Sequence, residues 1–225
     1  TALDCSNCGA PLQATANGAL DCRYCGTPHS HDPGGPKKAN LLVLAFAAHR
    51  AKNFEEALEY YNRVLELDAR DPWAWYGKGV SALWTSTVAN VRTAEALASI
   101  NAALRIALEV EPQLGLDLMQ RAGRDFNNFG AGLYKLAQDR LWHRETGFSA
   151  SASYQRAVLD ALEVLESGNT LAPENRQVLI NIREICDREL GTSASAGPGA
   201  YRDQLCAARK LAVHAIRELD ALPST

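Results

Sequence analysis

Four of the six cysteines lie within the first 25 residues, in two Cys-x-x-Cys-Gly units. Cys5 and Cys8 form the first unit, Cys22 and Cys25 form the second, and thirteen residues separate the units. This spacing allows two tight turns to present four thiolates to a single ion. The glycine after each second cysteine lets the backbone turn sharply, so that amide N–H groups can point at the sulfurs. The sequence therefore predicts a four-thiolate metal site.

The segment between the two units has the features of a β-hairpin. Two short stretches between Leu12 and Leu20 flank Asn17-Gly18, and Asn-Gly is the strongest short hairpin signal. Together with the two cysteine units, this segment makes residues 3–27 resemble the zinc-ribbon family. The resemblance implies one structural Zn²⁺ ion ligated by Cys5, Cys8, Cys22 and Cys25. So short a segment has too few large apolar side chains to fold unaided, which gives the metal a folding role.

Other states of these cysteines are possible. Two disulfides agree with the count, but paired Cys-x-x-Cys units and the lack of a secretion signal argue against them. Ribbons of the rubredoxin and rubrerythrin type hold iron with the same two units, so iron is the alternative metal. A four-helix di-iron centre would need glutamate three positions before histidine, and none of the five histidines has one. His29 and His31 lie in a polar Pro/Gly-rich loop, where solvent-exposed histidines are a simpler interpretation than a second metal site.

The periodicity of the apolar residues becomes helical after this loop. Apolar side chains recur at intervals of three and four from Leu41 to Ala48 and from Phe54 to Leu65, which predicts an antiparallel helix pair joined near Lys52-Asn53. The chain then divides into three parts: a ribbon at 1–27, a Pro/Gly linker at 28–36 and a helical domain at 37–225.

The first helix pair resembles a tetratricopeptide repeat (TPR). Residues 53–68 are similar to the second helix of that repeat, and a turn precedes Pro72. Trp75 lies 34 residues after Leu41, which is the length of the repeat. Trp75 and Gly79 stand where the family has its first-helix tryptophan and packing glycine, so we expect Trp75 in the core.

The repeat is readable over about residues 38–110. Its second copy, at Glu95-Ala96-Leu97, comes 39 residues after Glu56-Ala57-Leu58, so five extra residues are expected in the turn at 84–90. Degenerate or capping helices are expected at about 112–145, 150–168, 173–190 and 199–221, the first of them broken near Gly130 or Gly132. The predicted fold is mainly α: a right-handed TPR-like antiparallel helical solenoid with a small N-terminal β zinc ribbon.

The TPR resemblance also implies a place for a partner. Such scaffolds bind a peptide or a partner helix along a concave surface lined by the first helix of each pair. The matching positions here are Leu42, Phe46, His49, Trp73, Tyr76, Val80 and Trp84. The polar clamp with which some members hold a terminal carboxylate is absent, because Leu42, Phe46 and Gly77 occupy most of its positions. Large aromatic side chains favour an apolar partner; alternatively, the ribbon or the C-terminal helices fill this surface.

The charge balance argues against nucleic acid as the partner. The chain has 23 Lys and Arg against 26 Asp and Glu, a net charge of −3. One segment, residues 115–149, mixes basic and aromatic residues as single-strand binders do. It has five Lys and Arg and four Asp and Glu, so its net charge is only +1, which is typical of a solvated amphipathic helix.

Catalysis finds no support in the sequence. There is no phosphate-binding glycine loop, nucleophile elbow or metalloprotease His-Glu pair. Cys186 and Cys206 follow apolar residues and are expected to be small core residues.

No apolar run approaches the length of a membrane-spanning helix. The sequence predicts a cytoplasmic zinc-binding adaptor, not an enzyme, that docks a protein or peptide partner. A nucleic-acid-associated factor that uses the ribbon is the alternative, and a redox protein with an iron-loaded ribbon is a more distant one.

Overall fold

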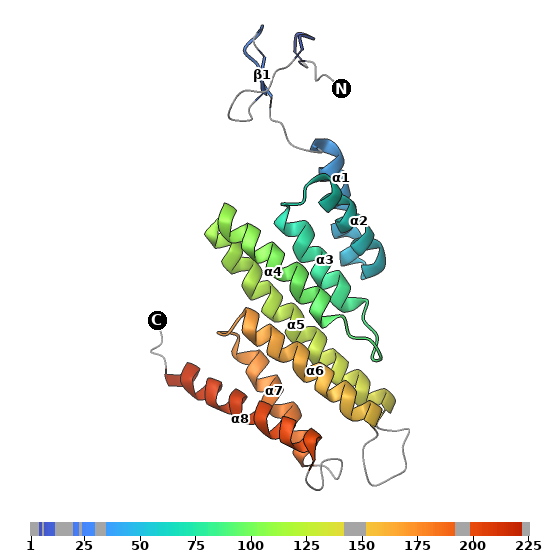
Figure 1. The fold of residues 1–225 in the computed structure, drawn as a ribbon, viewed down its shortest axis with the longest axis vertical. Helices are drawn as coiled ribbons and strands as arrows, with labels where there is room; N and C mark the ends of the chain where they lie inside the picture. Colours follow the sequence, from blue (N-terminus) through green and yellow to red (C-terminus); the bar gives the residue numbers. More distant parts are fainter. Residues whose placement is uncertain are drawn as a thin grey trace.

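The computed structural model describes residues 35–141, 152–191 and 199–221, together with residues 5, 7–11, 20–22 and 24–29 of the N-terminal segment. Successive helices pack on one another in chain order, and Figure 1 shows them stacked along the long axis of the molecule. The described helices are α1 (Gly35–Arg50), α2 (Phe54–Leu67), α3 (Pro72–Trp84), α4 (Thr93–Val110), α5 (Pro112–Leu141), α6 (Ala152–Leu171), α7 (Arg176–Leu190) and α8 (Ala200–Ala221). The described part is therefore mainly helical, and its arrangement agrees with a TPR-like solenoid.

Local signals set where the first helices begin. The side chain of Asn53 accepts a hydrogen bond from the Glu56 amide at the start of α2, and its Nδ2 donates to the Glu56 carboxylate at 2.7 Å. Asp71 accepts from the Ala74 amide at 2.9 Å and is followed by Pro72 in the first turn of α3. These side chains pair amide groups that a helix start leaves without an intrahelical partner.

Glycines bring α3 close to both of its neighbours. A Cβ added at Gly77 would lie 2.1 Å from Cζ of Tyr61 on α2, and one at Gly79 would lie 2.9 Å from the Ala96 carbonyl oxygen on α4. Any larger side chain would force these helices apart. The packing role predicted for Gly79 is confirmed.

The predicted break in the long helix is wrong, because α5 runs without interruption from Pro112 to Leu141. A Cβ at Gly130 would lie 2.8 Å from Cγ of Leu165, so this glycine is the site where α6 crosses closely. The contact between the two helices offsets the roughly 1 kcal/mol that an interior glycine costs a helix. The extra length predicted at residues 84–90 is found in the α3–α4 turn, where Thr87 and Asn90 pair their backbones.

The buried side chains form two clusters. The smaller one joins α1, α2 and the start of α3, and it consists of Leu41, Ala45, Ala48, Ala57, Tyr61, Val64 and Ala74. The larger one extends from α3 to α8 and includes Leu83, Phe126 and Leu165, which are fully buried. The first helix pair therefore has a small core of its own.

The N-terminal segment contains one short strand pair. Strand β1 (Leu20–Asp21) pairs antiparallel with β2 (Pro28–His29), on either side of the second cysteine unit. The hairpin predicted around Asn17-Gly18 lies outside the described residues. Strand β2 and the start of α1 at Gly35 both fall in the range predicted as a linker. None of the helices among the described residues is long and apolar enough to cross a membrane.

Candidate metal centre and partner-binding surface

The two cysteine units have the same backbone structure. In the first, the Cys5 amide donates to the Ala10 carbonyl at 2.7 Å and the Gly9 amide donates to the Cys5 carbonyl at 2.8 Å. Cys22, Gly26 and Thr27 repeat both hydrogen bonds in the second unit, at 3.0 and 2.8 Å. The two glycines have φ of +74° and +70°, in the left-handed region that other residues rarely adopt. This explains why glycine follows each second cysteine.

The two turns bring the four sulfurs together. All four Sγ atoms lie within 4.8 Å of one another; Cys5 and Cys25 are 3.6 Å apart, and Cys8 and Cys22 are 3.5 Å apart. A tetrahedral ion with metal–sulfur bonds of about 2.3 Å would hold its sulfurs about 3.8 Å apart. None of the four cysteines forms a disulfide. They are placed to bind one metal ion.

The protonation of the thiols is consistent with a site for a cation. Hydrogen bonds from the side chain and backbone of Thr27 lower the pKa of Cys25 to about 5. The Ala10 backbone acts in the same direction on Cys8, but the hydrogen bond with the Cys22 thiol, together with desolvation and the other two thiols, outweighs it and raises the Cys8 pKa to about 12. Four sulfurs this close cannot all be thiolates without a positive charge among them. A divalent cation would replace the protons that keep them together.

The residues predicted to bind a partner divide by their exposure. Phe46 and Trp84 are exposed, at 42% and 39% of their surface. Val80 is 1% exposed, so its predicted contact with a partner is wrong: it packs in the larger core. The remaining four are half-buried: Leu42, His49, Trp73 and Tyr76.

Phe46 and Trp84 belong to a ladder of rings that crosses three helix pairs. Phe46 meets Tyr61 edge-on at 6.1 Å, and His49 meets Phe54 edge-on at 5.1 Å. Trp84 stacks on Phe54 at 5.5 Å and meets Phe129 of α5 edge-on at 5.3 Å. We call this set of six rings the aromatic ladder. The second helix of the first pair and the first helix of the third thus hold Trp84 in place.

Helix α5 covers the other end of the predicted surface. The Tyr76 hydroxyl donates to the Asp125 carboxylate at 2.5 Å, and the Arg121 guanidinium lies 5.7 Å from the centre of the Trp73 ring. Burial raises the pKa of Asp125, while the bond from Tyr76 opposes that shift. Helix α5 therefore covers part of the predicted surface, around Trp73 and Tyr76, and leaves Phe46 and Trp84 accessible.

The prediction that Trp75 lies in the core is wrong. Trp75 is half-buried, its Nε1 donates to the Ala69 carbonyl at 2.9 Å, and Lys78 lies 5.2 Å from the centre of its ring. Trp75 lies in the first turn of α3, where its ring packs on the turn before the helix, whereas Gly79, one helical turn later on the same stripe, packs against α4. Helical spacing places Trp75 and Trp84 on different stripes but does not show which stripe meets a neighbouring helix.

Sequence reasoning missed a buried polar cluster around Glu189. This carboxylate is 1% exposed and accepts hydrogen bonds from the hydroxyls of Tyr134 (2.7 Å), Tyr154 (2.7 Å) and Tyr201 (2.9 Å). These tyrosines come from three different helices. The only signal in the sequence is an acid on the apolar stripe of α7, four residues after Ile185.

The remaining sequence expectations have mixed outcomes. Cys186 is buried as predicted, and burial raises its pKa to about 12. Cys206 is exposed, so its assignment to the core is wrong: it lines an open groove between α7 and α8. In the basic and aromatic segment, Phe126, Phe129 and Tyr134 are buried and cannot stack on bases. Trp142, His143 and Arg144 lie outside the described residues, as does His31.

Comparison with known proteins supports part of this interpretation. A family model described as Tetratricopeptide repeat matches residues 38–81. The match spans most of α1, all of α2 and most of α3, and the four cysteines lie outside it. A search of curated proteins found no match to the chain.

Proposed function

We propose that the protein is a cytoplasmic adaptor that docks a protein partner on the concave face of its first helix pairs and holds one Zn²⁺ ion in its four-cysteine cluster. TPR repeats generally form scaffolds for protein–protein interaction, and residues 38–81 match such a repeat. The proposal includes no catalytic step, because four thiolates complete a tetrahedral coordination and leave no position for a substrate.

The observation that carries the proposal is the aromatic ladder. Two of its rings, Phe46 and Trp84, are exposed on a surface whose other members are fixed by packing. Rigid, exposed aromatic side chains bind an apolar partner at little cost in conformational entropy, and they are the typical hot spots of protein interfaces. The partner's side chains that meet them are expected to be apolar.

The cysteine cluster supports the second half of the proposal. Its sulfur separations and its two matching turns fit a tetrahedral ion, and Zn²⁺ would supply the charge that holds the four thiolates together. Zinc is proposed over iron because such closed thiolate sites without a redox partner are typical structural zinc sites. Metal analysis of the purified protein is the direct test; iron in place of zinc would support the redox alternative.

Capture of partners by the full chain tests the adaptor function. Phe46→Ala combined with Trp84→Ala is expected to reduce the captured partner at least about fivefold, as measured by quantitative mass spectrometry. Leu116→Ala is the matched control, since Leu116 is 49% exposed on α5 and lies outside the aromatic ladder. Equal capture by the double variant and the wild type would contradict the proposed surface.

A further inference from the structure

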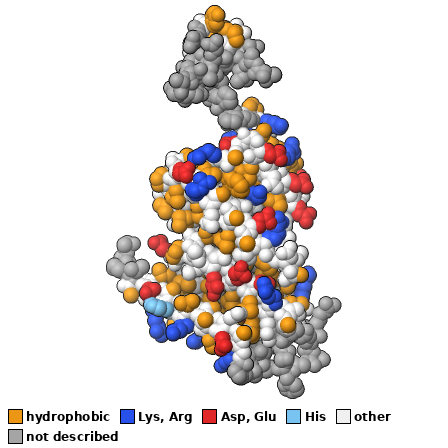
Figure 2. All heavy atoms as spheres, viewed as in Figure 1, with side chains coloured by type: hydrophobic (Ala, Val, Ile, Leu, Met, Phe, Trp, Pro, Cys, Tyr) orange, Lys and Arg blue, Asp and Glu red, His pale blue; other side chains and the backbone are white. Residues whose placement is uncertain are grey.

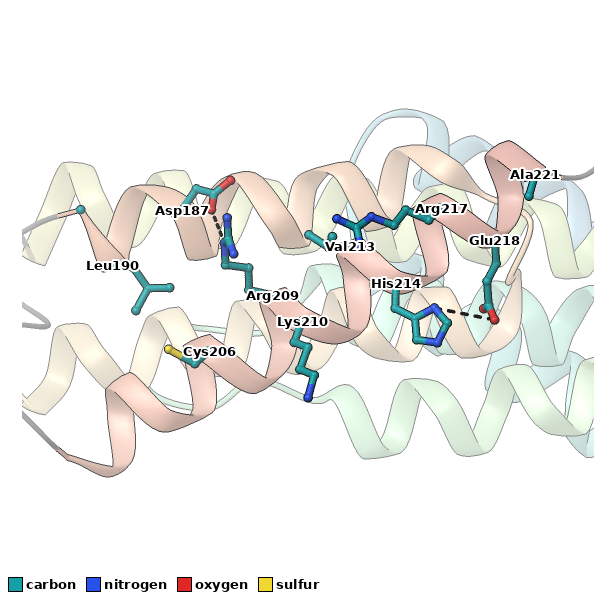
Figure 3. A pocket seen from close by; sticks show the side chains of 11 residues that line it. Asp187, Leu190, Cys206, Arg209, Lys210, Val213, His214, Arg217, Glu218 and Ala221 are labelled. Carbon is teal, nitrogen blue, oxygen red and sulfur yellow. Dashed lines mark hydrogen bonds and ion pairs between the residues drawn. The ribbon is translucent and has the colours of Figure 1, made fainter.

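A groove lies between α7 and α8, and none of the residues that line it belongs to the aromatic ladder. It has a volume of about 910 Å³ and runs along α8 from the C-terminal end of α7. Its apolar members include Leu190, Cys206 and Val213, and Lys210 and Arg217 line it as well. Figure 3 shows Cys206, Lys210, Val213 and Arg217 along the length of α8, with Leu190 at the end of α7. The groove therefore presents both apolar and positively charged side chains to an occupant.

The packing of the earlier helix pairs shows what can occupy the exposed side of the last helix. The second helix of each earlier pair packs against the first helix of the next: α2 against α3, α4 against α5, and α6 against α7. Helix α8 is the second helix of the last described pair, and among the described helices it packs chiefly on α7. By the same operation that builds the solenoid, the exposed side of α8 presents a place for one more helix.

The charge of the groove selects the kind of helix. Of the two acids that line it, Asp187 pairs with Arg209, and Glu218 lies 3.7 Å from the Nδ1 atom of His214. Lys210 and Arg217 add two further positive charges. Figure 2 shows Lys and Arg side chains gathered at the edge of the molecule where α8 lies. An occupant with an apolar stripe would pack against the apolar side chains of the groove, and acidic side chains beside that stripe would pair with Lys210 and Arg217.

The opposite flank of α8 has the opposite charge. The hollow between α6 and α8 is lined by Asp160, Glu163 and Glu166 against one cation, Arg156. An acidic helix is therefore attracted to one side of α8 and repelled by the other. This asymmetry makes the α7–α8 groove distinguishable by charge from its nearest alternative.

We infer that the α7–α8 groove binds an amphipathic helix of a partner protein whose apolar stripe is flanked by acidic side chains. This inference rests on the proposed role as a protein-binding scaffold and names a second surface for it. Lys210 and Arg217 supply the attraction, and Leu190 and Val213 supply apolar contact.

A synthetic helical probe tests the inference on the full chain. The acidic probe is a fluorescent peptide of about 20 residues with leucine at the a and d positions of each heptad and glutamate at e and g. The basic probe is a matched peptide with lysine in place of each glutamate. In fluorescence anisotropy at low salt, we expect the acidic probe to bind at least about tenfold more tightly than the basic one. Lys210→Glu with Arg217→Glu should weaken the acidic probe at least about tenfold, and Lys210→Gln with Arg217→Gln should weaken it less.

Two controls keep the outcome specific. Arg105→Glu with Arg140→Glu changes the net charge equally on exposed residues of α4 and α5, and it should leave binding of the acidic probe within about twofold. Failure of the acidic probe to bind, or binding that ignores Lys210 and Arg217, would overturn the inference. The partner capture that depends on Phe46 and Trp84 would be untouched by either result.

A second copy of the chain is the competing occupant. Light scattering of the wild type and of the Lys210→Glu, Arg217→Glu variant measures the oligomeric state. A monomer in both cases supports the inference. A dimer that dissociates in the variant would assign the groove to self-association instead.

Discussion

The cysteine segment and the helical domain are ordered by different interactions. Around the cysteines, the described contacts are two matching turns, a two-residue strand pair and four sulfurs within 4.8 Å. The helical domain buries large side chains along its whole length, from Leu41 in α1 to Ile216 in α8. We therefore expect the first region to depend on a bound ion and the second on packing. Each part should respond to a perturbation that leaves the other unchanged.

Removal of the metal is expected to have the largest effect. A chelator, or Cys22→Ser, should reduce bound zinc from about one ion per chain to almost none and abolish the ordered cysteine turns. Helical circular dichroism should stay near the wild-type value, because the helices are held by their own cores.

Thiol labelling reports the same change residue by residue. Exposed Cys206 should react in the loaded protein, the four cluster cysteines only after chelation, and buried Cys186, with its raised pKa, only after unfolding. Loss of helical signal on chelation would show that the two regions depend on each other.

Truncation in the larger core comes next. Phe126 is fully buried on α5, and Phe126→Ala is expected to lower the free energy of unfolding by about 3–5 kcal/mol, measured by urea denaturation. Zinc content should not change. Leu116→Ala on the same helix is the control and should cost far less, because Leu116 is half exposed. Equal costs for both variants would contradict the assigned burial.

The buried carboxylate should matter through its hydrogen bonds. Glu189→Ala leaves three buried tyrosine hydroxyls without this acceptor and is expected to destabilise the fold by about 2–4 kcal/mol. Glu189→Gln keeps an oxygen acceptor and the side-chain volume, so it should cost less. Thermal denaturation compares the two. A larger loss for Gln than for Ala would show that hydrogen bonding is not the source of the stability.

The tryptophans should show the smallest effects. Trp84→Ala loses its contacts with Phe54 and Phe129, and Trp75→Ala loses contacts at the margin of α3; each should cost about 1–2 kcal/mol, or a few degrees in Tm. Only Trp84→Ala should also weaken partner capture. A loss of 3 kcal/mol or more in the free energy of unfolding for Trp75→Ala would show that Trp75 is a core residue after all.

The sequence was informative wherever the deciding contacts are local. The spacing of Cys5, Cys8, Cys22 and Cys25 predicts the metal cluster, since two short turns suffice to bring the sulfurs together. The helical periodicity and the Gly and Pro stops place the helices from Pro112 onward to within a few residues. The TPR pattern identifies the first helix pair because the contacts between its two helices recur at fixed spacing.

The tertiary structure decided which faces of these helices are buried. Tyr76 is covered by α5, whose Asp125 lies 49 residues after it, and no local pattern marks that contact. Gly130 continues a helix because α6 crosses there, and Glu189 is buried because hydroxyls from three other helices converge on it. Periodicity defines the stripes of a helix, but only the neighbours that pack against them determine whether a stripe becomes core or surface.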